Sequence, residues 1–188
     1  MGAGIVGAAT AYALIQRFPD RSILVVDKEK QCASHQTGRN SGVIHAGVYY
    51  PPESLKAKFC KEGLNRTIDF CRQHQIPYEQ CGKLLVATNQ LELTRMHGLF
   101  ERCKTNQISC ELLDQTELQK REPNISGLGA IWVKDTGITD YPKITAKLLS
   151  LFATLGGKTQ LSCQIDTLKE TESGIYLGNE HTQFSCDF

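Results

Sequence analysis

The chain has 188 residues, enough for one domain and part of a second. Its formal net charge is +1, which favours neither nucleic acid nor an anionic membrane as a partner. We recognise no signal peptide and no apolar run long enough to span a membrane, and the eight cysteines lack the spacing of a metal site, so we expect a reduced, cytoplasmic protein without a bound metal.

A glycine motif opens the chain, in which Gly2, Gly4 and Gly7 follow the pattern G-x-G-x-x-G. In dinucleotide-binding proteins the first glycine makes a tight turn, the second lets the backbone approach a diphosphate, and the third lets helix and strand pack closely. A helix expected over residues 8–17 would direct its N-terminal N–H groups toward the phosphates. The motif therefore predicts a diphosphate site.

The next segment, Ser22–Val26, is apolar and ends at Asp27. Its β-branched, nearly continuous character is typical of a buried parallel strand. An acidic residue about 20 positions after the glycines is the acceptor that a ribose 2′-hydroxyl needs. Lys28 adjoins this position and is a further candidate for contact with the nucleotide, although one lysine gives little support to a 2′-phosphate and NADP.

Residues 28–50 are rich in Gly, Ser, Asn and His and show little periodicity. Small residues let a backbone lie against a flat ligand, so we expect an ordered cofactor-binding loop here. The later patterns predict helices over 53–74, 89–106, from 114 to before 123, and 142–155. We expect capping boxes of Asn89 with Glu92 and of Asp114 with Glu117, and one shared face in the 53–74 helix for its apolar residues Leu55, Phe59, Leu64, Ile68 and Cys71. Strands are expected over 82–88, 109–113 and 128–133, and two or three more within 158–169 and 174–177.

This order of elements predicts an α/β protein with a discontinuous layout. Residues 1–75 and 136–188 would form a Rossmann-like dinucleotide-binding domain, and residues 76–135 an inserted α+β portion of a substrate domain.

Four segments carry a family resemblance: residues 2–7, 26–29, 37–50 and 54–60. Together they resemble the FAD-dependent L-2-hydroxyglutarate oxidases and dehydrogenases, which belong to the D-amino-acid-oxidase-like flavoproteins. The block 38–60 is the most specific part, and residues 135–141 support it. The resemblance implies an FAD-binding domain of Rossmann type with the inserted substrate domain, both incomplete.

The resemblance also implies site residues. For FAD, the glycines and Asp27 keep the roles given above, and the further matching positions are Thr37, Asn40, Ser41, Gly42 and, through its backbone and in a late strand, Ile165. The implied reaction oxidises a 2-hydroxy acid to a 2-oxo acid, with hydride passing to flavin N5.

His45 is the preferred general base, since histidine titrates near neutral pH. It could instead bond flavin or backbone, or carry covalently attached flavin. Arg39 and Lys56 are candidates for the substrate carboxylates, although Arg39 could hold the loop or a flavin phosphate and Lys56 could be merely solvated. Tyr49 could donate to substrate or simply pack. The other four histidines show no partner at useful spacing, and we expect them at the surface.

Several alternatives remain open. A relative acting on glycerol 3-phosphate or an amino acid is one, an NAD-dependent dehydrogenase is another, and an inactive fragment is a third. Because family members carry a strand before the glycines and continue well beyond residue 188, we expect roughly the N-terminal half of an enzyme, which alone binds FAD poorly and turns over nothing. Oxygen or a quinone would accept the electrons, with peripheral contact to the inner membrane left open.

Overall fold

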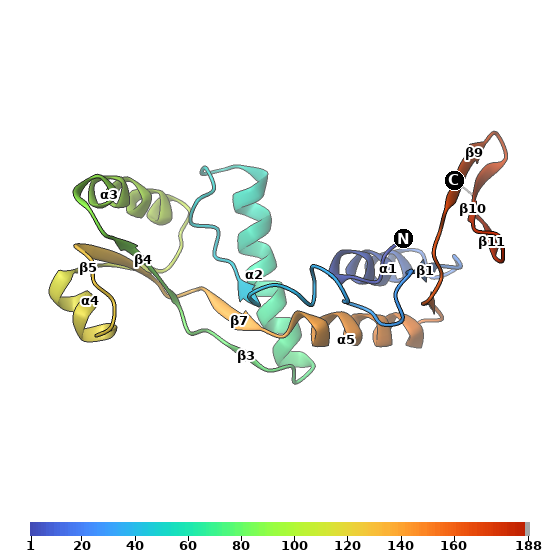
Figure 1. The fold of residues 1–188 in the computed structure, drawn as a ribbon, viewed down its shortest axis with the longest axis horizontal. Helices are drawn as coiled ribbons and strands as arrows, with labels where there is room; N and C mark the ends of the chain where they lie inside the picture. The colour runs from blue at the N-terminus through green and yellow to red at the C-terminus, as the bar shows by residue number, and fades with distance from the viewer. Residues whose placement is uncertain (187–188) are drawn as a thin grey trace. The chain divides into compact units, whose positions relative to one another are not determined.

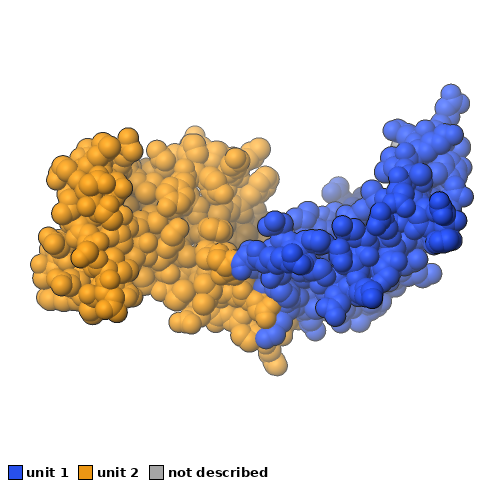
Figure 2. Space-filling view, in the orientation of Figure 1, with its two compact units in different colours: residues 1–40, 141–188 blue, residues 41–140 orange. Residues whose placement is uncertain are grey.

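Residues 1–186 are described by the computed structural model of the protein. They divide into two compact units, the first formed by residues 1–40 and from 141 onward, the second by residues 41–140 (Figure 2). These divisions differ from the expected boundaries, since residues 41–75 and 136–140 belong to the second unit. The assignment of one portion to the cofactor and the other to the substrate stays a prediction.

The first unit combines two helices with a parallel strand pair and a separate antiparallel sheet (Figure 1). Its elements are α1 (Ile5–Arg17), β1 (Leu24–Val26), α5 (Tyr141–Thr154), β8 (Lys158–Gln160), β9 (Thr167–Thr171), β10 (Gly174–Gly178) and β11 (Gln183–Cys186). β1 and β8 run parallel, with Val25 opposite Thr159, and α1 packs against α5. Val25 and Phe152 are buried in the shared core. The helix–strand alternation confirms the expected α/β class.

The second unit contains two small antiparallel sheets and three helices, two of which, α3 and α4, pack against the same sheet (Figure 1). Its elements are β2 (Val43–Ile44), α2 (Leu55–Gln73), β3 (Tyr78–Glu79), β4 (Lys83–Ala87), α3 (Gln90–Thr105), β5 (Cys110–Asp114), α4 (Gln115–Arg121), β6 (Gly129–Val133) and β7 (Gly137–Thr139). The strand orders are β4–β6–β5 and β2–β7–β3. Met96 and Cys103 of α3 are buried in one cluster with Ile131 and Val133 of β6.

The apolar positions of α2 differ in their burial. Leu64, Ile68 and Cys71 are buried, but Leu55 and Phe59, at the same helical spacing, are 68% and 65% exposed. The periodicity correctly predicted the helix and its shared apolar face, and the structure buries only the C-terminal part of that face.

Side-chain caps fix the helix starts. Asp114 and Glu117 form the expected reciprocal capping box at α4. At α3, Asn89 accepts from the Glu92 N–H at 3.0 Å, but the Glu92 carboxylate turns to the N–H and hydroxyl of Thr88. The expected capping box of α3 is therefore only half present.

Candidate functional site

The glycine turn leads directly into α1, whose N-cap is Gly4. Gly2 has φ +101°, a conformation that side-chain-bearing residues rarely adopt. A Cβ on Gly7 would lie 1.9 Å from the Gly2 carbonyl oxygen, closer than any real contact. The first glycine is therefore required by its backbone conformation, and the third by the close approach of helix and turn.

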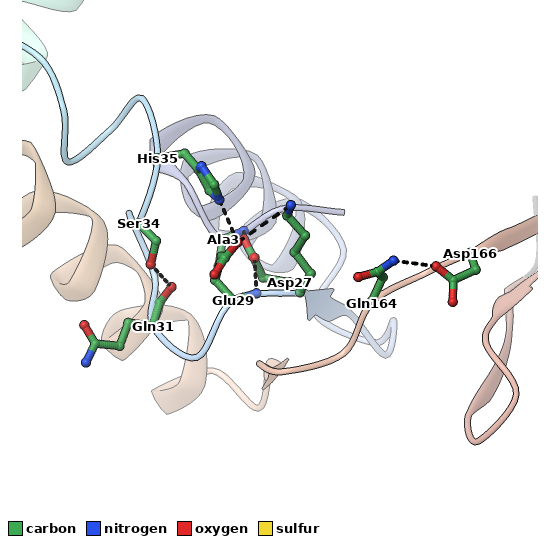
Figure 3. Close-up of polar contacts among 9 residues, drawn as sticks. Ala3, Asp27, Glu29, Gln31, Ser34, His35, Gln164 and Asp166 are labelled. Carbon is green, nitrogen blue, oxygen red and sulfur yellow. Dashed lines mark hydrogen bonds and ion pairs between the residues drawn. The ribbon is translucent and has the colours of Figure 1, made fainter.

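Hydrogen bonds to distant residues hold this turn in place. The Gly2 N–H donates to the Val26 carbonyl at 2.7 Å, and the Ala3 N–H donates to Asp27 Oδ2 at 2.5 Å (Figure 3). From the following loop, Thr37 Oγ1 accepts from the Ile5 N–H at 2.9 Å. The turn is thus positioned by the end of β1 and by a buried threonine 32 residues further along the chain.

The N-terminus of α1 retains unused donors. The N–H groups of Gly4, Val6 and Gly7 have no hydrogen-bond partner among the described residues. A cavity of about 480 Å³ lies beside them, with Thr37 also in its wall. Free N–H groups and the positive end of a helix dipole favour an anion, so this part of the chain fits a diphosphate.

Asp27 follows β1 and is already oriented by the backbone. Its Oδ2 accepts from the Ala3 N–H, and its Oδ1 accepts from the Glu29 N–H at 2.9 Å (Figure 3). A carboxylate has about four acceptor positions, so acceptor capacity remains for sugar hydroxyls. The structure therefore places the predicted ribose acceptor at the predicted diphosphate turn.

A charged cluster next to Asp27 was missed in the sequence. Glu29 Oε1 lies 2.8 Å from His35 Nε2 (Figure 3). The same oxygen lies 3.7 Å from Lys28 Nζ. The hydrogen bond to His35 lowers the pKa of the Glu29 carboxyl. The expectation that His35 has no partner is wrong, because loop curvature brings residues six apart together. Lys28 is engaged by Glu29, which weakens the case for a 2′-phosphate.

Two predicted cofactor positions lie in loops. The Asn40 side-chain amide donates to the carbonyls of Gln36 and Thr37, at 2.8 Å each. Ile165 lies between β8 and β9, so its expected place in a strand is wrong. Its chain segment nevertheless reaches the end of β1, since the Cys163 N–H donates to the Asp27 carbonyl at 2.9 Å. No described residue bonds the backbone N–H of Ile165.

His45 lies in the second unit, directly after β2. Ile44 and Ala46 are buried on either side, and His45 is exposed because side chains alternate in extended backbone. Gly42 opens β2 with φ +70°, and a Cβ there would lie 2.6 Å from the Thr139 carbonyl oxygen. The preference for glycine at this position therefore has a structural cause within the unit.

The predicted substrate residues are exposed. Tyr49 is 58% exposed, and Lys83 Nζ lies 5.5 Å from the centroid of its ring. Arg39 and Lys56 form no ion pair with a described residue. Lys83 is a further cation beside a predicted substrate residue, and its position in a regular strand pattern gave no signal for it.

The predicted residues thus fall into two groups. The first unit gathers, around its glycine turn, Gly2, Gly4, Gly7, Asp27, Lys28 and Thr37, with Arg39, Asn40 and Ile165 in adjoining loops. The second unit carries Ser41, Gly42, His45, Tyr49 and Lys56. The roles of these residues toward cofactor and substrate stay predictions.

Two kinds of feature are absent from residues 1–186. No group of three or more potential metal-ligating side chains lies together there. Within the same residues, no helix is both long and apolar enough to cross a membrane.

Comparison with known proteins identifies related sequences. The family described as FAD dependent oxidoreductase matches residues 1–186. The chain is 48% identical over 193 residues to L-2-hydroxyglutarate dehydrogenase of Escherichia coli (strain K12), covering 99% of this chain and 46% of that protein. It is 45% identical over 188 residues to the mitochondrial L-2-hydroxyglutarate dehydrogenase of Homo sapiens, covering 100% of this chain and 39% of that protein. The chain therefore spans under half the length of these relatives.

Solved structures share the fold at low sequence identity. Glycine oxidase from Geobacillus kaustophilus superposes with a TM-score of 0.87 at 17% identity, covering 99% of this chain and 52% of that one. The reduced L-alpha-glycerophosphate oxidase from Mycoplasma pneumoniae, solved with FAD bound, superposes with a TM-score of 0.83 at 22% identity, covering 95% of this chain and 48% of that one. These similarities show the fold alone, and they confirm the expected α/β architecture.

Proposed function

Because the chain belongs to the FAD dependent oxidoreductase family, as its sequence predicted, we propose that it contributes to an enzyme that oxidises L-2-hydroxyglutarate to 2-oxoglutarate. The observation that carries this proposal is 48% identity, over almost the whole chain, to an enzyme named for this substrate. The alternatives with glycerol 3-phosphate or an amino acid have weaker support, since the proteins with such names resemble this chain in fold only.

The first unit provides the features that FAD requires. Three free N–H groups at the start of α1 would hold the diphosphate, and Asp27 would accept from the ribose hydroxyls. Thr37 would keep the turn in the conformation that exposes these donors, because its hydroxyl oxygen accepts from the N–H of Ile5, the first residue of α1. FAD supplies the acceptor for the substrate hydride, which no side chain of the protein can provide.

The second unit supplies the proposed proton acceptor. His45 is exposed, so an imidazole nitrogen can take the proton of the substrate hydroxyl as the C2 hydride leaves. Tyr49 can donate a hydrogen bond to a substrate carboxylate. Of the cations, Arg39 can bind a carboxylate through two N–H groups, whereas Lys56 acts as a single charge.

Electron acceptor and location belong to the same proposal. Oxygen or a quinone reoxidises the flavin, and the enzyme acts in the cytoplasm or at the surface of the inner membrane. Measuring oxygen consumption beside reduction of a soluble quinone separates the two acceptors.

The test is the variant His45→Ala in the enzyme that contains these residues, compared with His97→Ala, an exposed histidine of α3. Loss of a general base should lower turnover of L-2-hydroxyglutarate about 100-fold or more, at unchanged flavin content. His97→Ala should be silent. Normal turnover of His45→Ala with normal flavin would remove His45 from the role, and a wild-type enzyme inactive on this substrate would refute the proposed function.

The 188 residues alone should bind FAD weakly and show no turnover, as expected from the sequence. An absorbance spectrum of the purified chain, after mixing with FAD and removal of free flavin, checks the first point. Stoichiometric bound flavin with turnover would contradict it.

A further inference from the structure

The segment from His45 to Tyr50 is held through its backbone carbonyls. Cys60 Sγ of α2 donates to the His45 carbonyl at 3.2 Å. Arg102 Nη1 of α3 donates to the Tyr49 carbonyl at 3.4 Å, and Asn106 Nδ2 donates to the Tyr50 carbonyl at 3.0 Å. Side chains of two helices thus take the place of a strand partner for this segment.

These side-chain bonds are needed because the sheet ends before the segment. β2 ends at Ile44, after only two pairs with β7. Beyond it, Ala46 and Val48 are buried while His45 and Tyr49 are exposed. The buried residues fix the alternation, but the unpaired carbonyls would otherwise leave the backbone free to twist.

Asn106 lies where the segment and both helices meet. It is the half-buried C-cap of α3, and Lys61 of α2 donates to its carbonyl at 3.5 Å and to Gln107 Oε1 at 2.9 Å. Its bond to Tyr50 is the shortest of the three bonds and is part-buried, whereas the Arg102 bond is long and exposed. Asn106 should therefore dominate this set of contacts.

Cys60 has the complementary position at the other end of the segment. A Cβ on Gly47 would lie 3.3 Å from Cys60 Cβ and Sγ, so the turn packs directly on this cysteine. Burial raises the pKa of the Cys60 thiol, which keeps the proton that it donates to His45. The segment is therefore fastened at its first and last residues.

We propose that Asn106 is a positioning residue, which together with Cys60 fixes the backbone of residues 45–50 so that His45 and Tyr49 are presented in one orientation. The holding of the segment follows from the second unit alone. Its consequence for catalysis rests on the proposed function of His45 and Tyr49.

Hydrogen exchange of the 188-residue chain tests the structural part. The Tyr50 N–H donates to the Gly47 carbonyl at 3.1 Å and reports opening of the segment. In Asn106→Ala, exchange in a peptide covering residues 45–52 should become about threefold to tenfold faster, as loss of one hydrogen bond predicts. A peptide from α2 should be unchanged. The control is Thr105→Ala, whose hydroxyl bonds only the Glu101 carbonyl within α3.

Unchanged exchange of the segment in Asn106→Ala would overturn the proposal, as would equal acceleration throughout the second unit. Asn106→Asp provides a second variant of the same shape without the donor, and it should reproduce the alanine result. If both variants failed to fold while Thr105→Ala folded normally, Cys60→Ala would replace them, with Cys60→Ser expected to restore slow exchange because serine keeps a donor.

Kinetics of the complete enzyme test the catalytic part. Asn106→Ala should lower kcat for L-2-hydroxyglutarate about threefold to tenfold with flavin content unchanged and the enzyme still folded at the assay temperature, while Thr105→Ala matches the wild type. Faster exchange with unchanged kinetics would confirm the holding of the segment and refute its part in the reaction. A wild-type enzyme inactive on this substrate would refute the proposed function, and the exchange result would still stand.

Discussion

Replacing Gly7 by alanine should destabilise the protein, although alanine is the better helix former. The added Cβ would lie 1.9 Å from the Gly2 carbonyl oxygen and 3.0 Å from its carbon. Both atoms are backbone, so no side chain can rotate away, and α1 must move relative to the turn. The same movement would disturb the Ile5–Thr37 bond and the free N–H groups beside it.

The size of the effect comes from two opposing contributions. Alanine in a helix is favoured over glycine by about 1 kcal/mol. Overpacking of a closely packed site costs about 1–3 kcal/mol, and a backbone clash of this depth belongs at the upper end. The net loss in the free energy of unfolding should therefore be about 1–2 kcal/mol. At Gly63 of α2 nothing lies within 4 Å of the added Cβ, so Gly63→Ala should gain about 1 kcal/mol.

Urea unfolding followed by circular dichroism measures both variants, and hydrogen exchange of α1 and α2 assigns each change to its unit. The reasoning predicts opposite signs for the same substitution at two helical glycines. If Gly7→Ala were as stable as Gly63→Ala, the close approach of helix and turn would be refuted. FAD titration of the complete enzyme should also show weaker binding for Gly7→Ala only.

Three other outcomes follow from the structure. Asp27→Asn should lower the free energy of unfolding in urea by about 1.5–3 kcal/mol, because one of the two backbone N–H groups that bond Asp27 loses its charged acceptor. The control Asp20→Asn, at an exposed position, should leave this free energy unchanged. Equal effects of the two substitutions would contradict the reasoning. Because the folded-state pKa of Glu29 is lowered, its contribution to stability is present above pH 4.5 and is lost as the pH falls through the folded-state pKa. Glu29→Gln should remove this part of the acid sensitivity of the thermal unfolding midpoint. The same pH dependence in Glu29→Gln and the wild type would contradict this. Burial raises the pKa of Cys103 to about 11, so its contribution to stability is present below pH 9 and is lost as the pH rises toward 11. At pH 8, iodoacetamide should modify the exposed Cys81 much faster than the buried Cys103. Equal modification rates, measured by mass spectrometry, would argue against a buried thiol.

Local patterns predicted the parts of the fold that depend on neighbouring residues. The spacing of Gly2, Gly4 and Gly7 implied a turn into a helix, and the structure shows the forbidden Cβ positions and the left-handed backbone behind it. The position of Asp27 could be predicted because, in this architecture, the residue that ends the second strand lies beside the glycine turn. The capping box at Asp114 could be predicted because its partners are three residues apart.

Other features depend on contacts between distant segments. Thr37 caps α1 from 32 residues away, and Asn106 bonds Tyr50 from 56 residues away. Neither bond has a periodic signal, since each requires a particular path of the loop between its partners. The exposure of Leu55 and Phe59 is of the same kind, because a helical period shows which residues share a face and not what covers that face.

The sequence by itself predicted a dinucleotide-binding α/β protein, since glycines at a turn and an acid after a strand are close along the chain, and its resemblance to a family implied FAD. Only the tertiary structure decided which N–H groups stay free for a ligand, which charges are already paired, and which side chains hold the His45 segment. The physical reason is that hydrogen-bond partners compete, and the outcome of that competition depends on distances that chain folding alone sets.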